Sequence, residues 1–363
     1  IWKNEDVKWK QIIAELMEIH YENENSIKII IQILVNNGQH DFAYERLIKY
    51  RQDKGTKDFY SMEMATYFGM RMAYDKAVTE YLLFLEYHRQ FTHALIFIPV
   101  GALLVTAVMH RIIARGLSFR QAYLSCLIGY ATHGLLDACT TYGTLLFWPF
   151  SDARIAWNNI SIIDPLFTLP ILALIILGVR SKSPNYARLA AVWGLAYLLI
   201  GISQRDRAEE AAYLLAESRG HEPIRLEAKP GFANLLLWKT VYETGGRYYI
   251  DAIRVGFANK SYPGTSAEKL DVRRHFPWLN PDTQQAADIE RFRWFSNDYL
   301  AVDPRTRNRV IDVRYSVVPN EIDALWAVDL DPEKPGDAHI TWRSLRRQTA
   351  AQTSRWWHML TAP

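Results

Sequence analysis

His133 and Asp137 are the pair of residues whose types and spacing most directly suggest chemistry. They lie four positions apart in an otherwise apolar stretch, so on a helix both side chains project from one face. Ionisable groups are costly in a bilayer and usually point into a polar interior or mark function. Imidazole nitrogen and carboxylate oxygen suit zinc, manganese or iron, and such sites need three or more ligands. The pair therefore predicts part of a divalent-metal site, with zinc as the first choice.

Further polar residues are expected beside this pair. His88, Arg89 and His93 lie in "YHRQFTHAL", at the mouth of the first apolar segment. The candidates that follow in the chain are Ser151, Arg154 and Asp164. A metal in such a cluster lowers the pKa of its bound water to about 7 and so activates that water. The guanidinium of Arg154 could neutralise an anionic substrate such as a phosphate ester.

Each candidate also has a structural interpretation. The roles left open are an interhelical hydrogen bond for His133 with Asp137, a helix cap for Asp164, a turn for Ser151, a headgroup anchor for Arg154, a helix start for His93 and simple exposure for His88.

Four apolar segments must position these residues: 94–109, 122–148, 160–179 and 189–202. Roughly 20 apolar residues are needed to cross about 30 Å of hydrocarbon. We therefore expect a mainly α fold with about four transmembrane helices. A helical bundle buried in a soluble protein is the alternative.

The charges of the intervening loops predict an orientation. Loops 110–121 and 180–188 each carry three basic residues, whereas loop 149–159 has no net charge. The positive-inside rule places the two basic loops in the cytoplasm. We expect a multi-pass protein of the bacterial inner membrane, with the site and everything after about residue 203 facing the periplasm.

Composition predicts three domains. Lys outnumbers Arg before about residue 90, and Arg outnumbers Lys after it. Residues 1–82 contain two stretches that align at a shift of 34, which resembles a pair of tetratricopeptide repeats; an ordinary helical bundle and a fusion of unrelated segments are alternatives. Residues 83–204 form the transmembrane core. Residues 205–363 alternate like β-hairpins, with a turn at Gly245-Gly246, and predict a small α+β domain.

Overall charge and cysteine usage exclude two classes of function. The net charge of +3 and the absence of a basic run argue against a nucleic-acid partner. Cys126 and Cys139 lie in apolar segments and are expected to be buried and unpaired.

Three long motifs carry a family resemblance. "YHRQFTHALIF", "HGLLDACTTYGTLLFWPFSDARIAW" and "IIDPLFTLP" resemble the bacterial membrane-bound metal-dependent hydrolases of the YdjM-like type, also described as LexA-binding, inner-membrane-associated hydrolases. The resemblance runs from about residue 85 to 174, and "RFRWFSNDYLAV" and "VIDVRYSVVP" extend it to about 330. It implies an integral inner-membrane protein and a distant relation to helical zinc-dependent phospholipase C and nuclease folds.

The resemblance also implies roles for particular residues. It carries over His93, His133 and Asp137 as metal ligands, with supporting roles for His88, Ser151, Arg154 and Asp164. His88 is a further candidate ligand. Family members normally have an Asp-rich "PDxD" motif ahead of the "HRxxTH" stretch, and residues 1–85 contain no match to it. This departure puts the completeness of the metal site in doubt.

Two functions remain open from the sequence. The first is a metal-dependent hydrolase of phosphoesters or lipids at the membrane surface, in which Asp137 or Asp164 orients the water or accepts its proton. The second is a non-catalytic membrane adaptor that binds a protein partner through the N-terminal repeats. Transport is disfavoured because no inverted repeat is visible.

Overall fold

The structure is a computed structural model that describes residues 12–56, 59–61, 64–65, 68, 89–112, 116–345 and 349–362. It separates into two compact units, Ile1–His88 with Trp278–Phe295 and Asp329–Trp342, and Arg89–Pro277 with Ser296–Val328 and Arg343–Pro363. These units are defined by packing and do not test the division into 1–82, 83–204 and 205–363, which stays a prediction.

The described part of the first unit contains a helical pair. Helices α2 (Glu24–Asn36) and α3 (His40–Lys54) pack through buried apolar side chains that recur at helical spacing, including Ile27, Ile31 and Leu47. The unit also contains α11 (Gln284–Phe295). The second predicted repeat falls largely outside the described residues, so the tetratricopeptide assignment stays a prediction.

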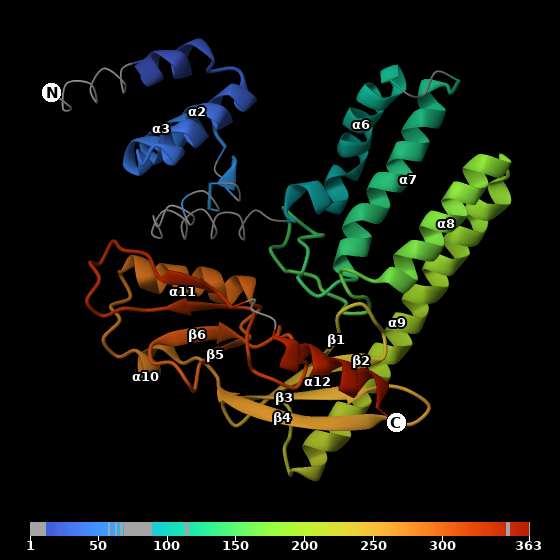
Figure 1. The fold of residues 1–363 in the computed structure, drawn as a ribbon, viewed down its shortest axis with the longest axis vertical. Coiled ribbons are helices and arrows are strands. Elements are labelled where there is room, and N and C mark those ends of the chain that lie inside the picture. The colour runs from blue at the N-terminus through green and yellow to red at the C-terminus, as the bar shows by residue number, and fades with distance from the viewer. Residues whose placement is uncertain are drawn as a thin grey trace. The chain divides into compact units, whose positions relative to one another are not determined.

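The second unit holds the apolar helices (Figure 1). Two short 3-10 turns, η1 (Phe91–His93) and η2 (Leu95–Phe97), lead into α6 (Ile98–Ile112), which packs against α7 (Phe119–Ala138). Helix α8 (Pro165–Ser181) packs in the same way against α9 (Pro184–Ser218). The second unit therefore contains two helical hairpins, each closed by a connection of a few residues.

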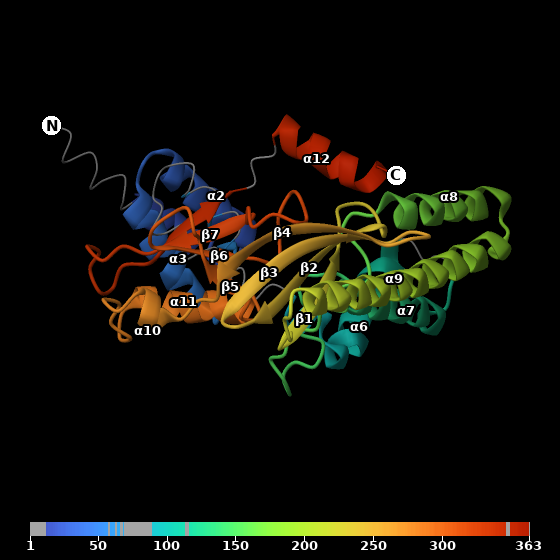
Figure 2. The same cartoon turned by 90° about the horizontal axis from the view of Figure 1, so that it is seen from below.

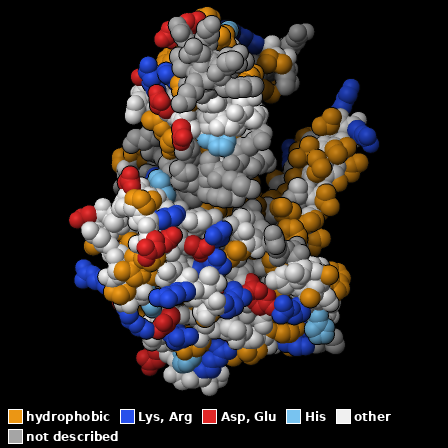
Figure 3. All heavy atoms as spheres, turned by 60° about the vertical axis from the view of Figure 1, so that its left-hand side comes forward, with side chains coloured by type: hydrophobic (Ala, Val, Ile, Leu, Met, Phe, Trp, Pro, Cys, Tyr) orange, Lys and Arg blue, Asp and Glu red, His pale blue; other side chains and the backbone are white. Residues whose placement is uncertain are grey.

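Large apolar side chains cover the outside of these hairpins. Val100, Leu104 and Val108 on α6 are exposed, as are Leu169 and Val179 on α8. Figure 3 shows side chains of this kind along the projecting helices, with Lys and Arg at the tip. Water-soluble proteins rarely expose apolar patches of this extent, and such a surface marks contact with a membrane or a partner. A lipid environment explains the exposure.

The expectation of about four transmembrane helices in a mainly α fold is wrong. Among the described residues only two helices are long and apolar enough to cross a membrane, Leu95–Ile112 and Pro184–Ser218. Helix α8 is apolar but has 17 residues. Helix α7 ends at Ala138, so the predicted segment 122–148 is a helix followed by a folded loop. Hydropathy overestimates the number of spans because it counts apolar loop residues and helix residues alike.

The β content is also larger than a mainly α fold allows. Strands β1 (Arg225–Pro230), β2 (Leu237–Thr244), β3 (Arg247–Arg254) and β4 (Lys260–Glu268) form an antiparallel meander. A second four-stranded sheet has the order β5 (Leu300–Val302), β6 (Arg309–Asp312), β7 (Trp326–Asp329) and β8 (Thr341–Ser344). The chain also forms the short helix α10 (Val272–His275) and, near its end, α12 (Ala350–Thr361).

Strand β2 shows how the first sheet is sandwiched. The side chains of its even-numbered residues Trp238 and Tyr242 pack against the C-terminal half of α9. The small side chains of Ala208 and Ala212 let the helix approach the sheet closely there. Its odd position Val241 packs with residues of β5 and β6 on the opposite face. Side chains alternate between faces along a strand, so both faces of β2 are buried. Figure 2 shows α9 lying along the sheet.

Candidate functional site

Four ionisable side chains meet where η1 contacts the C-terminal end of α7. Asp137 Oδ2 lies 2.8 Å from Arg89 Nε and 3.0 Å from His93 Nε2. The rings of His93 and His133 lie against each other at a tilt of 38°, with centroids 4.3 Å apart. The structure thus brings together three predicted ligands, His93, His133 and Asp137, and adds an arginine. We call these four residues the polar cluster.

Two threonines complete the hydrogen bonds around the polar cluster. Thr92 Oγ1 lies 2.9 Å from His93 Nδ1. Thr140 Oγ1 accepts a hydrogen bond from Arg89 Nη1 at 3.0 Å and donates one to the carbonyl oxygen of Asp137 at 2.7 Å. The side chains of Arg89, His93 and Asp137 are only 10, 12 and 19% exposed. Charges so shielded from water interact strongly, so the cluster holds η1 firmly against α7.

A glycine on α7 allows η1 to come this close. A Cβ on Gly134 would lie 2.5 Å from the carbonyl oxygen of His93, which is backbone and cannot move aside cheaply. The loop after α7 holds η1 from the other side. Leu145 N donates to the carbonyl oxygen of Arg89 at 3.1 Å, and Leu95 N donates to that of Leu146 at 2.9 Å. Backbone contacts therefore set the position of His93.

Gly134→Ala is expected to destabilise the protein by about 2 kcal/mol, because the added methyl group pushes η1 away from α7. Thermal unfolding of the detergent-solubilised chain measures the loss. Gly129→Ala is the matched control, since it lies on the same helix with no atom within 4 Å of the added Cβ. That control should be neutral or stabilising by up to about 1 kcal/mol. Equal effects of the two substitutions would contradict the close-approach argument.

Asp164 and Ser151 do not join the polar cluster by any of their hydrogen bonds. Asp164 Oδ1 caps α8 by accepting from Leu166 N and Phe167 N, at 3.1 and 3.3 Å. Tyr197 of α9 donates to the same carboxylate at 2.9 Å. Ser151 Oγ accepts from the backbone of Ala153 at 3.2 Å, within a turn. These bonds match the structural roles left open for both residues, and their catalytic roles stay predictions.

Arg154 lies in the loop after α7 rather than in the polar cluster. Its Nη2 donates to the carbonyl oxygens of Tyr142 and Gly143, at 2.9 and 3.2 Å. Burial, together with the nearby charge of Arg314, lowers the pKa of Arg154 to about 10. The remaining predicted ligand, His88, lies outside the described residues.

The expected metal does not fit the polar cluster as its residues are placed. His93 Nε2 and Arg89 Nε both lie within 3.0 Å of Asp137 Oδ2, the oxygen that would face a cation. A guanidinium there opposes a second positive charge. Among the described residues, no group of three or more His, Cys, Asp or Glu side chains is placed to hold a metal ion. Zinc, manganese or iron as cofactor stays a prediction.

Sequence reasoning missed two features of this region. Arg89 lies in the "HRQFTH" stretch, and nothing in the spacing of the sequence pairs its side chain with that of Asp137. Tyr142 stacks on Tyr315 at 5.1 Å and on Trp326 at 5.9 Å, which ties the loop after α7 to the strand region. Only the aromatic residue types could have suggested this stack.

Helices with an apolar outer surface and a charged cluster between them are typical of membrane proteins. A model of the YdjM inner membrane protein family matches residues 68–208, a range that includes the polar cluster, helices α6, α7 and α8 and most of α9. This match confirms a resemblance to that family over residues 68–208, and the extension of the resemblance to about residue 330 stays a prediction. The chain matches no curated protein and no solved structure at a significant level.

Proposed function

We propose that the protein is a multi-pass inner-membrane hydrolase whose reacting groups are the polar cluster, on the periplasmic side. The single observation that carries the proposal is the contact of His93 Nε2 with Asp137 Oδ2 at 3.0 Å. A histidine held by a carboxylate through one ring nitrogen presents the other nitrogen as a general base. Phosphoesters and lipids are the substrate class that a membrane surface supplies.

The hydrogen bonds define how His93 would move a proton. Since Asp137 accepts at Nε2, the proton of the neutral ring lies on Nε2 and the basic lone pair lies on Nδ1. Thr92 Oγ1, 2.9 Å from Nδ1, shows that a hydroxyl fits at this position. With the Thr92 hydroxyl rotated away, a water in its place would lose a proton to Nδ1 as its oxygen bonds to phosphorus. The bond from phosphorus to the leaving oxygen then breaks, and the Nδ1–H group returns the proton to that oxygen. The carboxylate of Asp137 then stabilises the imidazolium of His93, and the guanidinium of Arg89 stabilises that carboxylate.

The test is hydrolysis of bis-p-nitrophenyl phosphate and of a short-chain phospholipid by the full chain in detergent. His93→Gln is expected to lower kcat at least 100-fold, because it removes the base while keeping a polar side chain. His110→Gln, a histidine on α6 outside the cluster, is the matched control and should keep full activity.

Metal analysis belongs to the same experiment. Activity that survives His93→Gln and Asp137→Asn would refute the proposal. Activity that is lost on chelation and restored by one stoichiometric metal would instead support a metal-dependent reaction, in which the metal displaces Arg89 from Asp137.

A non-catalytic adaptor is the second candidate. The saturation of Asp137 by Arg89 and His93 favours it, because such a network can act purely as a structural link between η1 and α7. The expected outcome for an adaptor is a metal-free, inactive protein that captures a protein partner through residues 1–82.

A further inference from the structure

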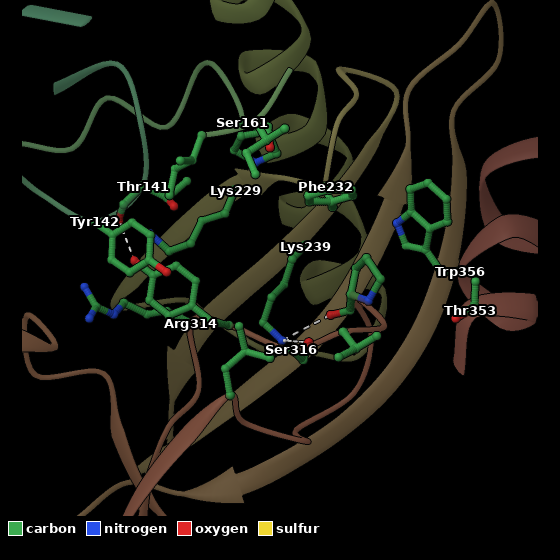
Figure 4. Close-up of a pocket in the computed structure, with 18 residues that line it drawn as sticks. Thr141, Tyr142, Ser161, Lys229, Phe232, Lys239, Arg314, Ser316, Thr353 and Trp356 are labelled. Atoms are coloured by element: carbon green, nitrogen blue, oxygen red, sulfur yellow. Dashed lines mark hydrogen bonds between the residues drawn. The ribbon is translucent and has the colours of Figure 1, made fainter. Parts of the chain in front are cut away.

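A cavity of about 560 Å³ lies within the second unit, away from the polar cluster's own side chains. It is bounded by the loop after α7, by β1 and β2, by residues 314–319 and by α12 (Figure 4). A volume of this size accommodates a small organic ligand.

Three buried cations line the cavity, and no acidic side chain among the described residues does. Lys229, Lys239 and Arg314 are each 4% exposed. Two of them have acidic partners outside the lining. Lys229 Nζ lies 2.6 Å from Glu227 Oε2, and Arg314 pairs with Asp312 at 2.7 Å. The charges of Lys229 and Arg314 are therefore balanced from outside the lining.

Lys239 differs from the other two cations. Its ammonium donates to Ser316 Oγ at 2.9 Å and to the carbonyl oxygens of Pro319 and Glu321, at 3.2 and 2.9 Å. These acceptors are neutral, and Lys239 forms no ion pair with any described residue. A buried charge without a counter-ion is costly, and an anion entering the cavity would offset that cost. Figure 4 shows its side chain extending along the cavity wall.

The remaining lining offers an apolar surface and one hydrogen-bond donor to a ligand. Phe232, Ile162 and Ile163 line the cavity and are also exposed to the outside, and the two isoleucines directly precede the apolar helix α8. Trp356 Nε1 is buried and forms no hydrogen bond with the described residues. In Figure 4 this nitrogen faces the cavity. An indole N–H can donate to an anionic oxygen, while the apolar rim can hold a chain that continues toward lipid.

We propose that this cavity binds an oxyanion carried on an apolar chain, with the Lys239 ammonium as its counter-ion and Trp356 Nε1 as a second donor. A phosphate headgroup of a membrane lipid has this chemistry. The site is distinct from the polar cluster, and its occupation does not depend on hydrolysis. Tyr142 connects the two, since its ring lines the cavity and also lies 5.4 Å from the guanidinium carbon of Arg89.

Isothermal titration calorimetry of the detergent-solubilised full chain tests the proposal. The three probes are dihexanoyl phosphatidic acid, zwitterionic dihexanoyl phosphatidylcholine and inorganic phosphate. Phosphatidic acid is expected to bind at least tenfold more tightly than either of the others. Equal binding of the zwitterionic lipid would overturn the anionic part of the proposal. Equal binding of inorganic phosphate would overturn the apolar part.

Lys239→Met should weaken the binding of phosphatidic acid at least tenfold, because it removes the charge and keeps a long apolar side chain. Lys260→Met, which removes a positive charge from β4 outside the cavity, is the matched control and should change the affinity less than twofold. Trp356→Phe keeps every charge and removes one donor, so it should weaken binding about fivefold even if Lys239→Met fails to fold. Unchanged affinity in Trp356→Phe and in any folded Lys239→Met protein would refute the site.

Discussion

Arg89→Met is expected to destabilise the protein by about 3 kcal/mol, because it leaves the shielded carboxylate of Asp137 without its closest cation. The distance from Arg89 Nε to Asp137 Oδ2 is 2.8 Å, and both side chains are more than four-fifths buried. The guanidinium also bonds to Thr140 Oγ1 and lies over the ring of Tyr142. Thermal or denaturant unfolding in detergent gives the free-energy difference.

A double variant separates the ion pair from simple packing. Arg89→Met with Asp137→Leu replaces both charges by apolar groups of similar size, and such replacements are often neutral or stabilising. The double variant should therefore lie within about 1 kcal/mol of the parent protein, with a coupling energy of about 2 kcal/mol or more. Arg205→Met is the control, because Arg205 pairs with the more exposed Asp206 and should cost less than about 1 kcal/mol. Additive losses in the double variant would contradict the buried pair.

The stability of the protein is expected to rise as the pH increases from 7 to 10, and Lys239 is the reason. Burial lowers the pKa of Lys239 from 10.5 to about 7. Between these values the unfolded chain keeps the proton that the folded protein has released. The unfolded state therefore binds more protons, and the free energy of unfolding increases with pH by on the order of 4 kcal/mol across this window. Below pH 7 both states are protonated and the effect ends.

Lys239→Met should abolish this part of the pH dependence. The measurement is the free energy of unfolding at pH 7, 8.5 and 10 for both proteins, and the quantity of interest is the difference between them. Four acidic side chains act on the ammonium in the opposite sense and limit the shift: Asp312, Glu321, Asp323 and Asp251. A difference that stays constant from pH 7 to 10 would show that Lys239 keeps its proton when folded. Added phosphatidic acid should also reduce the difference, because a bound anion favours the charged lysine.

The membrane helices show how far hydropathy carries a prediction. The apolar segments 94–109 and 160–179 largely coincide with η2 and α6 and with α8, because twenty or so apolar residues favour a helix wherever they lie. Hydropathy could not locate the end of α7. There Gly143 adopts φ +86 and Thr144 pairs with Ile155, so the apolar residues after Ala138 pack in a loop. Loop packing depends on contacts that composition does not contain.

Local sequence patterns are enough to place two parts of the polar cluster. His133 and Asp137 share a helix face because the helical repeat puts them there, and the "HRQFTH" stretch lies at the start of the neighbouring apolar segment. The simultaneous contact of Asp137 with Arg89 and His93 depends on long-range packing, because it needs η1 to lie against Gly134. Lys239 follows the same rule. Alternation along β2 places Lys239 on the same face of the sheet as Leu237 and Val241. The neutral acceptors of its ammonium come from residues about 80 positions further along the chain, which no local pattern can place.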